Sequence, residues 1–206
     1  MIILGANTGP YMFIISFQIK LHNSIDLEFV KVFSHDTRGG FFSSKADAAN
    51  KNPNNPDADL FSILDQLEGY RGVDGNFRFK LCYPELTWGA DGKKCNEWIQ
   101  SSNPLTEKPI AGFKPISLAF TINSLKEPWS GLGPSQWPNS VIDDRAITFG
   151  WFAIGSTKVY YDGIAGPRYS VDAEANKFGV VKKVQLYVQN RTSTGISPPL
   201  YSLFCP

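Results

Sequence analysis

Apolar and polar residues alternate along several short segments of this chain, as they do in β-strands that bury one face. The alternation is clearest over residues 11–21, 77–83, 116–122 and 184–189. Two further strands are predicted from apolar runs at 27–33 and 149–154, the second buried on both faces. In the segment 77–83, Cys82 falls on the side opposite Phe77, Phe79 and Leu81, so we expect its side chain to point away from the main core.

One segment has helical rather than alternating spacing. Asn55 is a suitable N-cap, Pro56 suits the first helical position, and Gly69 can end the helix. The apolar positions between them follow the i, i+3, i+4, i+7 pattern: Leu60, Ile63, Leu64 and Leu67. We expect one short amphipathic helix that plugs the end of a β-sandwich or covers a sheet edge.

Composition narrows the fold class. The 206 residues are 42% hydrophobic and 19% charged, which is typical of a single globular domain over residues 1–206, with 192–206 as a C-terminal tail. The 14% aromatic residues, 18 glycines and 14 prolines favour short strands joined by tight turns. The sequence therefore predicts an all-β protein, a β-sandwich of jelly-roll or lectin-like topology, with a barrel as the alternative.

Charge and hydropathy exclude two classes of partner. The net charge of +1 argues against a nucleic-acid partner, and no apolar stretch approaches the ~20 residues of a membrane helix, so no membrane insertion is expected. Residues 1–17 are apolar but lack a basic segment, which makes a poor signal peptide. Either a leader is missing from this chain or residues 1–22 belong to the mature fold.

The cysteines indicate the compartment. Cys82 and Cys95 flank a predicted turn at 88–92, which favours a disulfide over two reduced thiols and would stabilise the fold by roughly 3 kcal/mol. Cys205 is left over, as a free thiol or as a bridge in a homo-oligomer. Asn190 begins an Asn-Arg-Thr glycosylation acceptor. Together these features predict an extracellular, secreted protein despite the poor leader.

Two stretches combine the aromatic and planar polar groups that sugar recognition needs. One holds Asn96, Trp98 and Gln100, and the other is the Gly/Pro/Ser-rich loop that begins at Trp129 and ends at Arg145. We expect a shallow ligand site from the following residues: Trp129, Trp137, Asp143, Asp144 and Arg145, joined by Asn96, Trp98 and Gln100. The alternative is that the tryptophans fill the core.

Metal and catalytic chemistry have weaker signals. Asp143 and Asp144 are the preferred candidates for a calcium ion, although no EF-hand spacing is present. Familiar enzyme motifs are missing, so an enzyme is the less favoured expectation. A polysaccharide-active enzyme needs only two carboxylates, for which Glu85 and Glu97 are the candidates.

The block Cys-Asn-Glu-Trp-Ile-Gln-Ser-Ser-Asn-Pro at 95–104, followed by Trp-Phe-Ala-Ile-Gly at 151–155, resembles poorly characterised β-modules of invertebrate extracellular proteins. The resemblance spans roughly residues 29–188 and implies a single extracellular module without a known activity. Taken together, the sequence predicts a carbohydrate- or glycoprotein-binding, lectin-like module. The alternatives are a structural or adhesion component of an extracellular matrix and, third, the polysaccharide-active enzyme.

Overall fold

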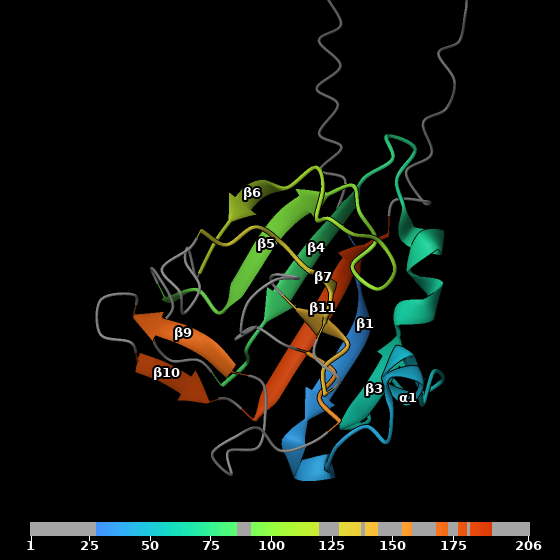
Figure 1. The fold of residues 1–206 in the computed structure, drawn as a ribbon, viewed down its shortest axis with the longest axis vertical. Helices are drawn as coiled ribbons and strands as arrows, with labels where there is room; N and C mark the ends of the chain where they lie inside the picture. The colour runs from blue at the N-terminus through green and yellow to red at the C-terminus, as the bar shows by residue number, and fades with distance from the viewer. Residues whose placement is uncertain are drawn as a thin grey trace, which may run out of the picture.

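The fold is all-β and sandwich-like, as the sequence predicts. The computed structural model describes residues 28–85, 92–119, 128–136, 139–143, 154–157, 168–172, 177–180 and 182–190. Most of these strands join one seven-stranded antiparallel sheet with the order β2-β3-β1-β11-β4-β5-β6 (Figure 1). Its strands are β1 (Phe29–Asp36), β2 (Asn50–Lys51), β3 (Leu60–Ile63), β4 (Phe77–Cys82), β5 (Cys95–Gln100), β6 (Lys114–Ser117) and β11 (Lys183–Gln189).

The centre of the sheet pairs the two ends of the described chain. β11 lies between β1 and β4, with His35 opposite Val184 on one side and Leu81 opposite Leu186 on the other. Side chains of directly opposed residues share a face of the sheet, so the alternation along each strand forms one continuous apolar face. On β4 and β11 this face consists of fully buried residues: Phe77, Phe79, Leu81, Val184, Leu186 and Val188.

The second layer, which covers the apolar face, is built from short elements and loops. β7 (Gly133–Pro134) pairs with β8 (Ile142–Asp143), and the ribbon lies in front of the sheet in Figure 1. Leu132 and Ile142, at this ribbon, are fully buried in the same core as the sheet residues. A separate two-stranded sheet joins β9 (Arg168–Asp172) to β10 (Lys177–Val180).

The predicted helix is wrong over its first half. Leu60–Ile63 form strand β3, and only then does the chain turn into the 3-10 helix η2 (Leu64–Tyr70), one residue beyond Gly69. Ser62 pairs with Phe33 of β1, so β3 satisfies backbone groups along the edge of β1 that a helix would leave unpaired. The Asn55–Pro56 pair lies in a turn before β3.

Other short helices were not predicted. The α-helix α1 (Lys45–Ala49) begins at Ser44, whose hydroxyl accepts from the Asp47 amide at 3.0 Å, and it buries Ala48. A 3-10 turn, η1 (Thr37–Gly39), follows β1.

The predicted strand at 116–122 overlaps β6 at its first two residues, the next two lie beyond β6, and residues 120–122 lie outside the described residues. β6 is an edge strand that ends at Ser117, and its Ile116 is 44% exposed. Ile154 forms an isolated bridge with Ile142, while the rest of the predicted strand at 149–154 lies outside the described residues. The predicted strand at 11–21, Cys205 and the tail at 192–206 also lie outside them.

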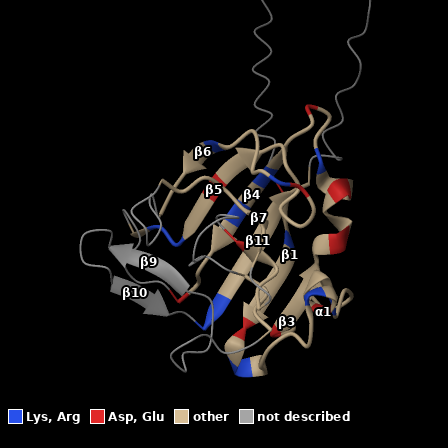
Figure 2. Ribbon diagram, in the orientation of Figure 1, with Lys and Arg blue, Asp and Glu red and all other residues tan. Residues whose placement is uncertain are grey.

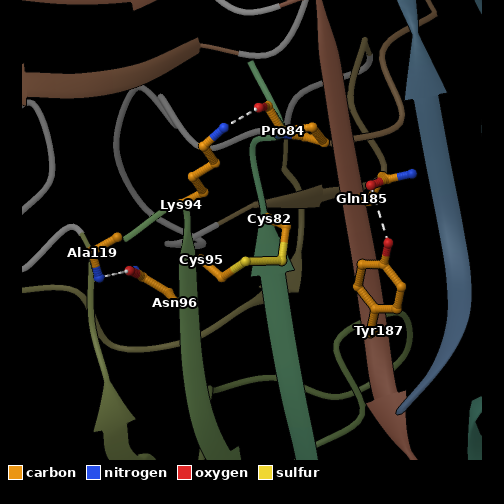
Figure 3. The surroundings of a disulfide bond; sticks show 8 residues. All are labelled: Cys82, Pro84, Lys94, Cys95, Asn96, Ala119, Gln185 and Tyr187. Atoms are coloured by element: carbon orange, nitrogen blue, oxygen red, sulfur yellow. Dashed lines mark hydrogen bonds between the residues drawn. A yellow bond between two sulfur atoms is a disulfide. The ribbon is translucent and has the colours of Figure 1, made fainter. Parts of the chain in front are cut away.

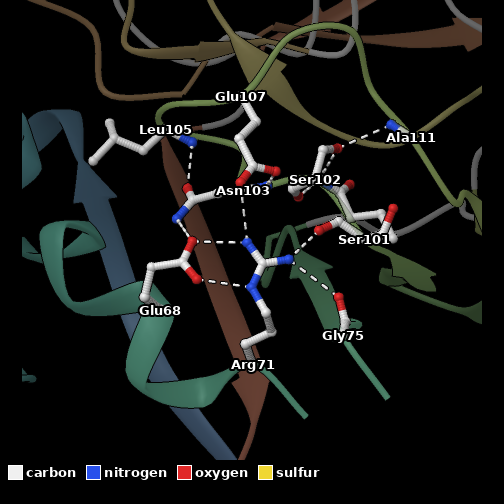
Figure 4. A network of polar contacts seen from close by, with 10 residues as sticks. Glu68, Arg71, Gly75, Ser101, Ser102, Asn103, Leu105, Glu107 and Ala111 are labelled. Carbon is white, nitrogen blue, oxygen red and sulfur yellow. Dashed lines mark hydrogen bonds and ion pairs between the residues drawn. The ribbon is translucent and has the colours of Figure 1, made fainter. Parts of the chain in front are cut away.

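Arg71 ties η2 to the loop that follows β5 (Figure 4). Its guanidinium donates to Glu68 at 2.7 Å and to Glu107 at 3.2 Å, and it donates to the Ser101 carbonyl. It also lies 4.3 Å from the centroid of the Phe77 ring. The hydrogen bond from Arg71 is the main reason that the pKa of Glu68 lies below its usual value. These contacts fix the end of the sheet opposite the β1–η1 turn.

His35 is a fully buried titratable group on β1. Its Nε2 lies 3.1 Å from the Gly40 carbonyl, and because a carbonyl only accepts, Nε2 carries the hydrogen in this contact. The ring packs edge-on against Phe42 at 5.1 Å, and its Nδ1 has no hydrogen-bond partner in the part of the chain that the structure describes. Burial lowers the pKa of His35 below 6.5, so the folded protein holds it neutral.

A pair of matched substitutions tests the central role of β11. Val188 is fully buried on β11, whereas Val73 is 98% exposed near the turn before β4. Val188→Ala should lower the free energy of unfolding by about 2 kcal/mol, through lost burial and a residual cavity. Val73→Ala should leave it within about 0.5 kcal/mol of wild type. Chemical denaturation of both variants measures the difference, and equal effects would contradict the burial of β11.

His35 makes stability depend on pH. Since its folded pKa is lowered, the unfolded chain takes up a proton as the pH falls through about 6.5 while the folded chain does not. The free energy of unfolding should therefore fall between about pH 7.5 and 5.5, by up to about 1.4 kcal/mol per pH unit. His35→Phe should lose most of this slope, because phenylalanine does not take up a proton. The same slope in wild type and His35→Phe would exclude His35 as its source.

Candidate functional site

The structure brings three of the predicted ligand-binding residues together, but inside the protein. Trp98 and Gln100 on β5 are fully buried, and Trp129 is 2% exposed. The indole rings of Trp98 and Trp129 meet edge to face with centroids 5.5 Å apart. They have no surface to offer a sugar, so we assign them the core role that was the alternative in the sequence analysis.

The Gln100 amide joins β5 to the loop that holds Trp129. Its Oε1 accepts from the Trp98 indole at 2.7 Å and from the Leu132 amide at 3.1 Å, while its Nε2 donates to the Leu132 carbonyl at 2.9 Å. A Cβ at Gly131, where φ is 94°, would lie 2.7 Å from Gln100 Oε1, so glycine is needed for this close approach. The amide replaces the water that these buried backbone groups would otherwise bind.

Other residues of the 95–104 block also hold the fold. Buried Asn96 accepts from the Ala119 amide at 2.8 Å through Oδ1, an interaction visible in Figure 3. The Ser102 hydroxyl accepts from the Ala111 amide at 3.0 Å, and Asn103 donates to Glu68 at 2.6 Å. These residues of the 95–104 block are thus engaged in structural contacts.

Of the four remaining predicted site residues, the structure describes one. Asp143 is fully buried on β8, and Trp137, Asp144 and Arg145 lie outside the described residues. Within the described ranges, no group of three or more His, Cys, Asp or Glu side chains is placed to hold a metal ion. The backbone amide of Asn190, the glycosylation candidate, donates to Glu28 at 2.8 Å.

The predicted disulfide between Cys82 and Cys95 is present. The two cysteines are directly opposed on β4 and β5, and their side chains lie on the face away from the core, as expected for Cys82 (Figure 3). A cross-link between these strands restrains the end of the β4–β5 pair.

The disulfide lies in the wall of an open pocket of about 400 Å³ on this outer face. Phe29 from β1 and Gln185 and Tyr187 from β11 line it on one side, and Lys80 of β4 and Lys94 before β5 on the other. Cys82, Cys95 and Pro84 complete the lining. Most of the lining residues stand on paired strands, so their positions are set by the sheet rather than by a loop.

Hydrogen bonds and burial orient the polar groups of the pocket. The Tyr187 hydroxyl donates to Gln185 Oε1 at 3.0 Å, which leaves the Gln185 NH₂ group without a partner among the described residues (Figure 3). Burial raises the pKa of Tyr187, so its hydroxyl stays protonated at neutral pH and remains a donor. The Lys80 ammonium lies 5.4 Å from the centroid of the Phe29 ring, a cation–π arrangement.

The two carboxylates considered for catalysis are engaged elsewhere. Glu97 accepts from Arg78 Nε at 2.7 Å on β5, and Glu85 accepts from the Lys182 amide at 3.0 Å and lies 3.5 Å from Arg38. Neither residue lines the pocket. The arrangement therefore offers binding groups, not a pair of facing carboxylates.

Sequence reasoning missed the pocket, although a signal for it was present. Tyr187 and Gln185 occupy the polar side of the 184–189 alternation, and Lys80 occupies the polar side of 77–83. An aromatic residue on the solvent side of a half-buried strand is the feature that points to a binding face. The missing information was that β11 pairs with β4, which places the two alternations side by side.

No protein-family model matches the chain, and no curated protein or solved structure is significantly similar to it. In the described part of the chain, no helix has both the length and the apolar character needed to cross a membrane.

Truncation of Trp129 distinguishes a core ring from a ligand platform. Trp129→Ala should lower the free energy of unfolding by about 3–5 kcal/mol, as truncation of a buried tryptophan does. Trp129→Phe, which keeps an aromatic ring against Trp98, should lose less. Denaturant unfolding of the two variants checks the order. An unchanged free energy of unfolding in Trp129→Ala would contradict the core assignment.

Proposed function

We propose that this protein is an extracellular carbohydrate- or glycoprotein-binding module that holds its ligand in the pocket beside the Cys82–Cys95 disulfide. The observation that carries the proposal is the combination in one pocket of two aromatic side chains, Phe29 and Tyr187, with a planar amide and two ammonium groups. An aromatic ring packs against the C–H face of a pyranose, while amide and ammonium groups bind its hydroxyls.

The chemistry of each group fits this role. The NH₂ of Gln185 is a donor held in place by the Tyr187–Gln185 hydrogen bond, and lysine ammonium groups each supply up to three donors. Gln185 and Lys80 stand on paired strands of the sheet, which reduces the loss of backbone freedom on binding. An open pocket of about 400 Å³ suits one or two sugar units at the end or side of a longer chain.

Three features support an extracellular location. The disulfide is of a kind that persists in oxidising compartments, and Asn190 begins a glycosylation acceptor. The 95–104 block, with its resemblance to invertebrate extracellular modules, points in the same direction. We propose secretion and membership of that module family on these grounds.

Binding to an array of glycans tests the proposal, with variants of Tyr187 as the probe. Tyr187→Ala removes the ring and should weaken glycan binding about tenfold, the value of one aromatic contact and its hydrogen bond. Tyr187→Phe keeps the ring and should lose less. Ile116→Ala, on exposed β6 outside the pocket, should bind as wild type does.

The melting temperatures of the variants separate binding from folding. Loss of binding in Tyr187→Ala with a melting temperature within a few degrees of wild type supports the pocket. If wild type binds no glycan, the proposal fails, and a structural or adhesion role in the extracellular matrix becomes the better interpretation.

A further inference from the structure

The charge of the pocket narrows the class of saccharide, an inference that rests on the proposed function. Lys80 and Lys94 both line the pocket, and no carboxylate does. The other lining residues are aromatic, neutral or disulfide-bonded. A neutral sugar would leave these two ammonium charges unbalanced, whereas an anionic group bound in the pocket would be attracted to both.

Neighbouring charges do not neutralise these two lysines. Lys80 forms no ion pair with any residue that the structure describes, although Glu97 lies directly opposite it on β5, because Glu97 pairs with Arg78. Lys94 donates to the Pro84 carbonyl at 3.0 Å, a neutral partner that leaves its charge unbalanced (Figure 3). The pocket therefore has two positive charges available for an anion.

The surrounding face adds to this potential. Lys31 lies directly opposite Tyr187, and its ion-pair partner Asp57 is 91% exposed, which weakens that pair by solvent screening. Figure 2 shows basic positions on β1, β4 and β11, and acidic positions on β5 and at the end of β1 that the ion pairs Arg78–Glu97 and Arg38–Asp36 account for. A basic face steers anionic ligands toward the pocket before contact.

We infer that the pocket binds an acidic saccharide, with a carboxylate or sulfate group held between Lys80 and Lys94. The sugar ring packs against Tyr187 and Phe29, and Gln185 donates to a ring substituent. Charge-assisted hydrogen bonds from two ammonium groups make this contact selective for acidic over neutral sugars.

Matched pairs of oligosaccharides test this inference with the full chain. The panel contains sulfated chondroitin, unsulfated chondroitin and carboxyl-reduced unsulfated chondroitin, and also polygalacturonate and its methyl ester. Acidic members should bind at least about tenfold more tightly than their neutral counterparts, and their affinity should fall as salt is raised. Comparison of sulfated and unsulfated chondroitin identifies which anion is preferred.

Lysine variants locate the charge effect. Lys80→Gln and Lys94→Gln should each weaken acidic binding about tenfold and weaken neutral binding much less, because glutamine keeps a hydrogen-bond donor but removes the charge. Lys114→Gln, which removes the same charge from edge strand β6, should stay within about twofold of wild type. Lys94 is exposed, so its variant keeps the test valid even if Lys80→Gln folds poorly.

The outcomes separate this inference from the proposed function. Equal binding of neutral and acidic members would overturn the charge selectivity and leave a glycan site standing, whereas binding of no member would overturn both. A loss in Lys114→Gln as large as in Lys80→Gln would replace the pocket by diffuse attraction to the basic face. If Lys80→Gln changes the oligomeric state but not saccharide binding, the inference is overturned, and the outer face of the sheet is an interface with a second copy of the chain.

Discussion

The pairing of β11 with both β1 and β4 holds the rest of the structure together. β11 is the last described strand, yet it occupies the middle of the sheet, where it buries Val184, Leu186 and Val188 completely. The opposite side of the same strand carries Gln185 and Tyr187 into the pocket. One strand therefore builds the core and the candidate site together. Its pairing with β1 closes a loop of more than half the chain, and this closure has to precede the formation of the core and of the site.

Burial of polar groups is the second constraint on the fold. The layer over the sheet consists largely of loops, whose backbone groups cannot all pair within regular strands. Gln100 and Asn96 extend from β5 to satisfy several of them, which explains why amides alternate with Trp98 on the buried side of that strand. A strand of purely apolar side chains would leave Leu132 and Ala119 with unpaired backbone groups at a cost of about 1–3 kcal/mol each.

Local pattern predicted the strands at 77–83 and 184–189 because their alternation is long and uninterrupted. It failed at Leu60–Leu67, where a strand followed by a 3-10 helix buries the same apolar positions that an α-helix would bury. Only the free edge of β1, a tertiary feature, decides between them. The short helix α1 was not predicted, although Ser44 and Asp47 have the spacing of a helix cap. Trp98 and Trp129 were expected at a ligand site for a related reason, since residue type alone does not tell a core tryptophan from an exposed one.

The contacts of β5 bear on what the Cys-Asn-x-Trp-x-Gln-Ser-Ser-Asn-Pro block says about function in any protein that carries it. In this chain Cys95, Asn96, Trp98 and Gln100 cross-link, cap or fill the fold, so a protein that resembles it in this block would resemble it in scaffold. The proposed ligand pocket depends instead on the alternate positions of β4 and β11, where Lys80, Gln185 and Tyr187 line it. Because an outward residue can change without loss of core burial, modules with the same block can differ in what they bind. Comparison of such modules should therefore follow the outer face of the sheet rather than the block that makes them recognisable.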